Sequence, residues 1–318
     1  MRVFSKIGVV GAGSYGLAIT QYFSRKVQEV ILIGNGVTSR EEVDQLYSST
    51  IVSGETLRAN VSYVNDFCRA QECELIFIAV PAAAVLDVCE KIREADVKAP
   101  IVSCSKGFDM ANGRLLSVSM EKILTNDIII FSGPSFASEV ARGLPAGVNI
   151  AGKNRELAQE ISLAFSSDSF RIETLNDYIS LQVAGAMKNA LAVGCGIVSG
   201  LKYGESGIAL LIVDGLKEMI ALSMSLGGRQ ESFFELCGVG DVVLTCTSKQ
   251  SRNVIFGEYI AGGGDMNNRN GNLAEGTFTI GAIPLLEKNS NVKLPLFSEL
   301  HKVVYERKSF CYFSSLYQ

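Results

Sequence analysis

A single lysine, Lys188, lies in a long and almost entirely apolar stretch between Val183 and Val198. Helical spacing puts it beside residues such as Ala184 and Leu191, so a nearly apolar helix carries one ammonium group. Removal from water lowers the pKa of a lysine, which suits it for proton transfer near neutral pH. The alternative is a lysine whose charged end reaches solvent at the helix surface.

A dense group of hydrogen-bond donors follows in the chain: Thr245, Thr247, Ser248, Ser251, Arg252 and Asn253. A phosphate needs such donors, and an arginine can bind it through two parallel hydrogen bonds. A Ser/Thr-rich turn is the alternative interpretation. Asp241, just before this group, follows two glycines and is either a ligand or the N-cap of a helix.

Two further polar clusters each follow an apolar, strand-like run. Lys106 comes directly after one run, and Ser132 to Ala137, which includes Ser135, follows the next. Ligands gather at the carboxyl edge of a parallel sheet, so both clusters are candidates for a binding site. A solvated loop charge is the alternative for Lys106.

The stretch from Lys6 to Ala18 contains the spacing G-x-G-x-x-G at Gly11, Gly13 and Gly16. The first glycine permits a tight turn, the second lets a pyrophosphate approach the backbone, and the third lets the helix pack on its strand. The motif stands between a strand-like and a helix-like run, and this context predicts nucleotide binding. A βαβ turn without a ligand is the alternative.

The end of the second strand-like run bears on the choice of nucleotide. NAD sites usually carry an acidic residue there, whereas this chain has Gly34 and Asn35, with Arg40 a few residues on. No carboxylate would repel a 2′-phosphate, so NADP is slightly favoured over NAD. Alternatively, Asn35 is a turn residue and Arg40 a solvated charge at the start of a surface helix.

The first half of the chain alternates strands and helices. Strand-like runs occupy 6–10, 30–33, 60–64, 75–80, 100–104, 128–132, 147–151 and 170–174, with helical patterns such as 85–92 and 157–165 between them. This pattern predicts a mainly parallel, doubly wound sheet over 1–175. From 176 the helical period dominates, at 177–197, 208–226, 280–286 and 296–305, which predicts an all-helical domain over 176–318.

Composition excludes several classes of protein. A net charge of −4 argues against a sequence-independent nucleic-acid binder, and 47% apolar residues indicate a folded protein. Charged residues interrupt the long apolar runs, so we expect no membrane span and a cytoplasmic protein. Eight cysteines without ligand spacing are expected to be buried, reduced thiols, and no metal site is expected.

The order of these motifs resembles the bacterial-type NAD(P)-dependent glycerol-3-phosphate dehydrogenases. The resemblance covers nearly the whole chain, through GAGSYG, CSKG, SGPSFASEV, AMKNALAVGCGIVSGL, GVGDVVLTCTSKQSRN and LAEG. It implies a Rossmann-like domain followed by an all-helical one. It also implies reversible, NAD(P)H-dependent reduction of dihydroxyacetone phosphate to sn-glycerol 3-phosphate, which feeds phospholipid synthesis.

The resemblance also implies roles for individual residues. Lys188 would be the catalytic acid/base. The substrate site would comprise Lys106, Gly133, Ser135, Lys188, Asp241, Ser251, Arg252 and Asn253. Ser14, Tyr15, Asn35, Lys106, Ala137, Arg252, Leu273 and Glu275 would line the cofactor site, together with Gly11, Gly13 and Gly16.

Two other functions remain open. A related β-hydroxyacid dehydrogenase would offer Arg252 a carboxylate, although the donor group from Ser248 to Asn253 argues mildly against it. A non-catalytic NADP-binding sensor would not need a lysine within an apolar helix. The very apolar helices of the second half favour a homodimer.

Overall fold

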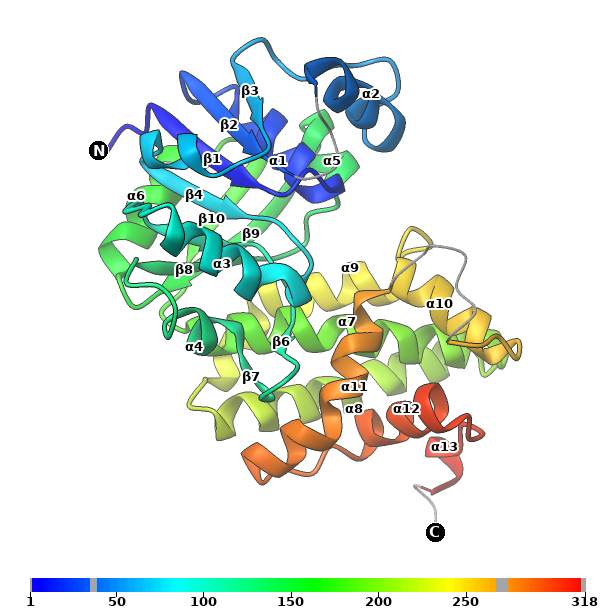
Figure 1. Ribbon diagram of the computed structural model, residues 1–318. Coiled ribbons are helices and arrows are strands. Elements are labelled where there is room, and N and C mark those ends of the chain that lie inside the picture. Colours follow the sequence, from blue (N-terminus) through cyan, green and yellow to red (C-terminus); the bar gives the residue numbers. More distant parts are fainter. Residues whose placement is uncertain (1, 35–38, 267–273, 316–318) are drawn as a thin grey trace. The chain divides into compact units, whose positions relative to one another are not determined.

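The computed structural model describes residues 2–34, 39–266 and 274–315, and it divides the chain into two compact units (Figure 1). Unit 1 comprises residues 1–105 and 116–178, and unit 2 comprises residues 106–115 and 179–318. The sequence-based division after Leu175 falls three residues before the third crossing of the chain between the units, at Tyr178. It also assigned residues 106–115 to the first domain, whereas they belong to unit 2.

Unit 1 is built on an eight-stranded sheet in the order β10-β9-β8-β5-β4-β1-β2-β3. Its neighbouring strands are parallel except for the β8–β9 pair, which is antiparallel. The strands are β1 (Lys6–Val10), β2 (Glu29–Ile33), β3 (Val61–Val64), β4 (Leu75–Ile78), β5 (Ile101–Ser103), β8 (Ile128–Ser132), β9 (Ala146–Gly152) and β10 (Phe170–Thr174). Strand order reverses between β1 and β4, where nucleotides bind in such sheets.

Apolar side chains on both faces of the central strands explain why helices cover this sheet. Leu32 and Phe77 on one face and Ile31 and Ile76 on the other are fully buried, and an aromatic group that includes Phe23 and Phe165 packs on the first face. The helices of unit 1 are α1 (Ser14–Phe23), α2 (Arg40–Thr50), α3 (Val85–Glu94), α4 (Leu116–Met120), α5 (Ala137–Arg142) and α6 (Arg155–Phe165), with the short 3-10 turns η1 (Cys68–Glu72) and η2 (Ala82–Ala84). The predicted doubly wound architecture is therefore confirmed.

Unit 2 is helical apart from the β6–β7 hairpin. Its elements are β6 (Phe108–Asp109), β7 (Arg114–Leu115), α7 (Tyr178–Gly200), α8 (Gly204–Ser225), η3 (Gln230–Phe234), the π-helical turn η4 (Leu236–Gly240), α9 (Asp241–Thr247), α10 (Arg252–Ala261), α11 (Glu275–Ser290), α12 (Pro295–Glu306) and α13 (Tyr312–Ser315). The predicted helical second half is confirmed, but the sequence patterns did not reveal the hairpin.

Helix α7 is the centre of unit 2, and it corrects one expectation. With 23 residues and a mean hydropathy of 1.3 over its most apolar window, it is long and apolar enough to cross a membrane. The whole of that window is buried inside unit 2, as expected for the core helix of a globular unit. The charge of Lys188 therefore does not make α7 too short or too polar to cross a membrane by length and composition, contrary to the expectation that charged residues interrupt every long apolar run. Among the described residues, no other helix meets that length and hydropathy.

The cysteines partly follow the expectation. All eight are free, and six of them are buried, whereas Cys68 and Cys311 are exposed.

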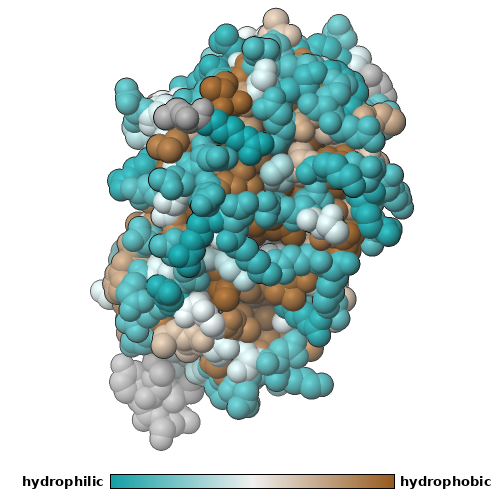
Figure 2. All heavy atoms as spheres, turned by 90° about the vertical axis from the view of Figure 1, so that its left-hand side faces the viewer, coloured by the Kyte–Doolittle hydropathy of each residue, from teal (hydrophilic) through white to brown (hydrophobic). Residues whose placement is uncertain are grey.

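Figure 2 shows one face of the molecule, where hydrophilic side chains predominate and hydrophobic ones show in small groups between them. No group of side chains in the described part of the chain has the composition of a metal site.

Candidate active site

Lys188, Asp241 and Lys106 form a charged cluster in unit 2, in which Lys188 and Asp241 are buried and Lys106 is half-buried. The Lys188 Nζ donates to Asp241 Oδ1 at 2.5 Å and to the Thr245 hydroxyl at 2.7 Å. The Lys106 Nζ donates to the other carboxylate oxygen, Oδ2, at 2.9 Å. The Lys188 side chain is only 6% exposed and that of Asp241 only 1%. The alternative of a solvent-reaching Lys188 is thus wrong, and Lys106 is not a solvated loop charge.

The proton affinities of this cluster follow from two ammonium groups that share one carboxylate. Burial and then the charge of Lys106 outweigh the attraction of Asp241 and lower the pKa of Lys188 to about 8. Burial works against the charge of Lys106 as well, but Asp241 outweighs it and raises the pKa of Lys106. The two lysines overcome the burial of Asp241 and lower its pKa. Lys188 can therefore gain or lose a proton near neutral pH, while Asp241 stays ionised.

Three separate elements hold these groups together. Lys188 comes from the middle of α7, Asp241 and Thr245 lie one turn apart on α9, and Lys106 precedes the β6–β7 hairpin. The chain folds back at η4 just before α9, where a Cβ on Gly238 would lie 2.2 Å from the Phe233 carbonyl oxygen. Asp241 is the first residue of α9, and the N-cap is Gly240. The Asp241 carboxylate accepts hydrogen bonds from the two lysines, so Asp241 is a residue of the site and not the N-cap of the helix.

Three of the six predicted phosphate donors, Ser251, Arg252 and Asn253, lie at the start of α10, whereas Thr245 and Thr247 belong to α9 and Ser248 lies between the two helices. Ser251 is the N-cap, and its hydroxyl accepts from the Val254 N–H at 3.4 Å. Arg252, the first residue of the helix, is exposed. Burial raises the pKa of Glu275, while the charge of Arg252, followed by those of Lys106 and Lys188, works in the opposite direction. Arg252, Lys106 and Lys188 therefore all lie close enough to Glu275 to act on its proton affinity.

Asn253 contributes to the framework of this region. Its Nδ2 donates to Asn189 Oδ1 at 3.0 Å, and its Oδ1 accepts from the Gly276 N–H at 3.0 Å. These two bonds join α10 to α7 and to the start of α11, next to Glu275. The sequence analysis did not assign a role to Asn189 or place Thr245 beside Lys188. The adjacency of Asn189 to Lys188 was the available signal for Asn189.

The glycine-rich turn of unit 1 has the geometry that a dinucleotide requires. Gly11 has φ +112°, and a Cβ on Gly16 would lie 1.9 Å from the Gly11 carbonyl oxygen, so neither position accepts a side chain. A Cβ on Gly13 would meet nothing within 4 Å, and Gly13 is the N-cap of α1. A phosphate could approach the backbone there, close to Ser14, because no side chain intervenes and the helix dipole attracts it. The residues present therefore fit a nicotinamide dinucleotide.

The other unit 1 residues lie near this turn and near the end of β8. The Tyr15 hydroxyl hydrogen-bonds the Ser135 hydroxyl at 3.1 Å, and the Ser135 Oγ donates to the Gly133 carbonyl at 3.1 Å. Ala137 is the first residue of α5, and a Cβ on Gly133 would lie 2.6 Å from the Gly147 carbonyl oxygen. The structure thus brings Tyr15 and Ser135 together.

Arg40 corrects the case for NADP. Its Nε donates to Asp44 at 2.8 Å, its Nη1 donates to the Val61 carbonyl at 2.6 Å, and its Nη2 donates to the carbonyls of Leu57 and Arg58. Four internal acceptors thus occupy four of the five N–H donors of this half-buried guanidinium. Arg40 therefore gives no specific support for a preference for NADP.

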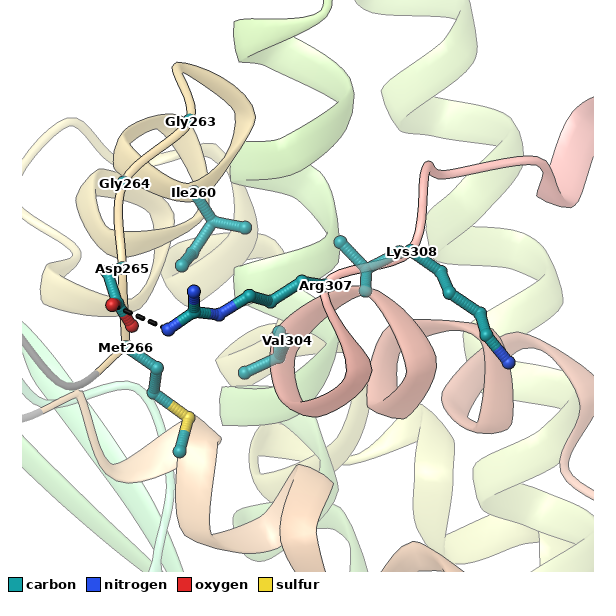
Figure 3. A pocket seen from close by; sticks show the side chains of 9 residues that line it. Ile260, Gly263, Gly264, Asp265, Met266, Val304, Arg307 and Lys308 are labelled. Carbon is teal, nitrogen blue, oxygen red and sulfur yellow. Dashed lines mark hydrogen bonds and ion pairs between the residues drawn. The ribbon is translucent and has the colours of Figure 1, made fainter.

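Asn35 and Leu273, two of the expected cofactor residues, lie outside the described residues. A pocket of about 180 Å³ lies elsewhere in unit 2 (Figure 3). Arg307 points toward Asp265 across this pocket and forms an ion pair at 2.6 Å, whereas Lys308 points away. None of the nine residues that line it is among the expected site residues.

A glycine-turn nucleotide fold in unit 1 and a buried lysine–aspartate pair in unit 2 define a nicotinamide-dependent dehydrogenase of the two-domain class. Residues 6–158 match the family of the NAD-dependent glycerol-3-phosphate dehydrogenase N-terminus, and residues 177–313 match the C-terminus of the same family. The chain belongs to the NAD-dependent glycerol-3-phosphate dehydrogenase family.

Individual relatives agree with this assignment. A glycerol-3-phosphate dehydrogenase [NAD(P)+] of Caulobacter vibrioides is 35% identical over 301 residues, which cover 92% of this chain and 90% of that protein. The crystal structure of glycerol-3-phosphate dehydrogenase from Coxiella burnetii has a TM-score of 0.90 at 30% identity and covers 100% of both chains. A D-mandelate dehydrogenase reaches a TM-score of 0.60 at 16% identity, which shows only that the fold is shared.

Proposed function

We propose that this chain catalyses the reversible NAD(P)H-dependent reduction of dihydroxyacetone phosphate to sn-glycerol 3-phosphate. The observation that carries the proposal is the buried Lys188 Nζ, 2.5 Å from Asp241 in a chain of this family. Its product would supply glycerophospholipid synthesis. The eight free cysteines and the family's substrate favour a cytoplasmic location.

A bound nicotinamide dinucleotide would supply the hydride in this reaction. We assign it to the glycine turn at Gly11, Gly13 and Gly16, with Ser14, Tyr15, Asn35, Lys106, Ala137, Arg252, Leu273 and Glu275 as the remaining contacts. Either NADH or NADPH is accepted in this proposal, and Arg40 creates no preference because four of its five N–H donors already bind internal acceptors. Equal KM values in Arg40→Ala and parent, for each cofactor, would support that point, and a rise confined to NADPH would refute it.

The residues of unit 2 would handle the proton and the phosphate. As the carbonyl oxygen gains negative charge, the Lys188 ammonium stabilises and protonates it, and in reverse the neutral amine accepts the hydroxyl proton. Asp241 and Lys106 orient Lys188 and the substrate hydroxyls. Ser251, Arg252 and Asn253, with Gly133 and Ser135 of unit 1, bind the remaining substrate groups. The phosphate supplies binding energy that fixes the carbonyl.

The oxidation of NADH and NADPH with dihydroxyacetone phosphate, measured by absorbance, tests the proposal. Lys188→Ala should lower kcat by roughly 10²- to 10⁴-fold, because a positioned general acid contributes about that much, and leave cofactor affinity unchanged. Glycerol 3-phosphate oxidation should rise as the pH passes about 8, where Lys188 loses its proton. Turnover of Lys188→Ala near that of the parent would contradict the assignment.

We also propose that the protein is a homodimer. Helix α8 presents a row of apolar side chains to solvent at helical spacing, with Leu210, Val213 and Met224 each more than 40% exposed. Apolar rows of this kind mark interaction surfaces, and soluble oligomers are most often symmetric pairs of one chain.

A further inference from the structure

The β6–β7 hairpin is the part of unit 2 that carries Lys106. Only two residue pairs form its ladder, Phe108 with Leu115 and Asp109 with Arg114. A two-stranded hairpin this short is at best marginally stable by itself in water. The Lys106 side chain has four rotatable bonds, so its Nζ stays 2.9 Å from Asp241 only if tertiary contacts hold its backbone.

The base and the turn of the hairpin are both fixed. Phe108 and Leu115 are 2% and 6% exposed and belong to the core of unit 2. At the turn, the Asp109 carboxylate accepts from the Ala111 N–H at 3.1 Å and from Asn112 Nδ2 at 2.8 Å. The hairpin therefore behaves as one body that is attached at its base and carries a rigid tip.

The tip is attached to the last turns of α11. The Nδ2 of Asn289 donates to the carbonyls of Asn112 at 2.8 Å and Gly113 at 3.2 Å. Gly113 has φ +56°, and a Cβ there would lie 2.7 Å from Leu285 Cγ, so the tip and α11 approach too closely for a side chain. One amide group thus satisfies two backbone carbonyls of the turn.

We propose that Asn289 is a positioning residue for the active site: by clasping the hairpin tip to α11, it holds Lys106 on Asp241. This inference rests on the proposed function for its kinetic consequences. Asn289 itself lies at the far end of α11 from Glu275 and makes no contact with the cluster at Lys188 in the described structure.

Displacement of Lys106 would change the proton affinity of Lys188. The charged or titratable groups around Lys188 are Asp241 and the Cys246 thiol on α9, Lys106 on the hairpin and Glu275 on α11. Of these, Lys106 is the positive charge that lowers the pKa of Lys188. When the hairpin loosens, this repulsion weakens and the pKa of Lys188 rises, so alcohol oxidation requires a higher pH.

Asn289→Asp tests the clasp, because it keeps the shape of the side chain, removes both donors and faces two carbonyls with a negative charge. We expect KM for dihydroxyacetone phosphate to rise by about five- to tenfold, the lower end of the loss expected for two net hydrogen bonds. The pH at half-maximal oxidation should move upward. Asn289→Gln keeps the donors and should restore most of the loss, and Lys288→Ala, an exposed neighbour on α11, should behave as the parent.

A double-mutant cycle separates positioning from general destabilisation. If Asn289 acts through Lys106, Asn289→Asp should change KM less than twofold in a Lys106→Ala background. Equal effects of Asn289→Asp in both backgrounds would overturn the proposal, as would an unchanged KM and pH profile in the single variant. Gly113→Ala disturbs the same tip from the other side and should produce the same coupled loss.

A third measurement does not depend on the reaction. Labelling of Lys106 by an amine-reactive reagent, read by mass spectrometry of the full-length protein, should be several-fold faster in Asn289→Asp than in the parent, with exposed Lys202 as the internal reference. Unchanged labelling would overturn the clasp even in an active enzyme. Faster labelling in a protein that fails to reduce dihydroxyacetone phosphate would support the clasp and refute the proposed function instead.

Discussion

At the scale of single residues, one carboxylate between two ammonium groups explains the chemistry of unit 2. Asp241 accepts from Lys188 at 2.5 Å and from Lys106 at 2.9 Å, and it is 1% exposed. A buried pair of equal and opposite charges would hold both groups ionised. Burial is the largest cause that lowers the pKa of Lys188 to about 8, and the unmatched positive charge of the second lysine adds to it. This arrangement prepares Lys188, rather than Asp241, for proton transfer.

Arg252 should act on substrate binding, because an exposed guanidinium among hydroxyl and amide donors suits a phosphate. We expect Arg252→Ala to raise KM for dihydroxyacetone phosphate by about 10- to 100-fold, from the ~1.5–3 kcal/mol of a charged hydrogen bond. Steady-state kinetics with dihydroxyacetone as the unphosphorylated comparison would measure this. Arg307→Ala, at the separate pocket, is the matched control. If the variant still discriminates between the two ketones as the parent does, the phosphate site is elsewhere.

At the scale of elements, side chains from distant helices accept the backbone N–H groups at the start of a helix that has no cap in its own sequence. Helix α12 begins without a side-chain cap at Leu294. Instead, Glu218 on α8 accepts from the N–H groups of Leu296 at 2.7 Å and Phe297 at 3.3 Å, and Glu287 on α11 accepts from that of Leu294. This long-range cap fixes α12 to α8 and α11.

The same cap predicts a pH effect on stability. Burial raises the pKa of Glu218 to about 7, although its two backbone hydrogen bonds oppose the shift and Asp214 and Glu287 add to it. A carboxyl whose folded pKa is raised holds more protons folded than unfolded, so the free energy of unfolding falls as the pH rises from about 4.5 toward 7. Glu218→Gln should flatten this slope in thermal unfolding between pH 5 and 8.

Glu205→Gln, an exposed residue of the same helix, provides the comparison for Glu218. It should keep the slope of the parent protein. If the stability of Glu218→Gln and that of Glu205→Gln depend on pH with the same slope, the pKa of Glu218 does not differ between the folded and unfolded states, and the prediction is wrong.

At the scale of the whole molecule, the chain builds two units with separate cores and crosses between them more than once. Residues 106–115 leave the sheet unit, enter the helical one and return. Unit 2 therefore holds the complete Lys106–Asp241–Lys188 cluster, although Lys106 follows a strand of unit 1.

The exposed apolar row on α8 carries the prediction of a dimer. Sedimentation velocity at micromolar concentration should give about twice the chain mass of 34.2 kDa. Val213→Glu, one turn from Leu210 in this row and 49% exposed, should shift the protein toward the monomer without unfolding it. A parent protein that sediments as a monomer would rule out the dimer.

The sequence by itself determined the strands of the large sheet, the main helices and the catalytic lysine candidate. Ile128–Ser132 and Phe170–Thr174 were predicted with the bounds that the structure gives, because apolar runs and helical periods are local signals. Lys188 was identified because one charge in an apolar helix stands out in any reading of the chain.

Only the tertiary structure decided what those charges contact. Arg40 looked like a free cation, yet three carbonyls from the segment that ends with the first residue of β3 bind it together with Asp44 of its own helix. Asp241 was equally open to interpretation as a helix cap, but the structure places two lysines on its carboxylate. The hairpin that brings Lys106 across to unit 2 left no periodic signal, since each of its strands has two residues. Contacts between residues more than 50 positions apart depend on packing, and spacing along the chain does not encode them.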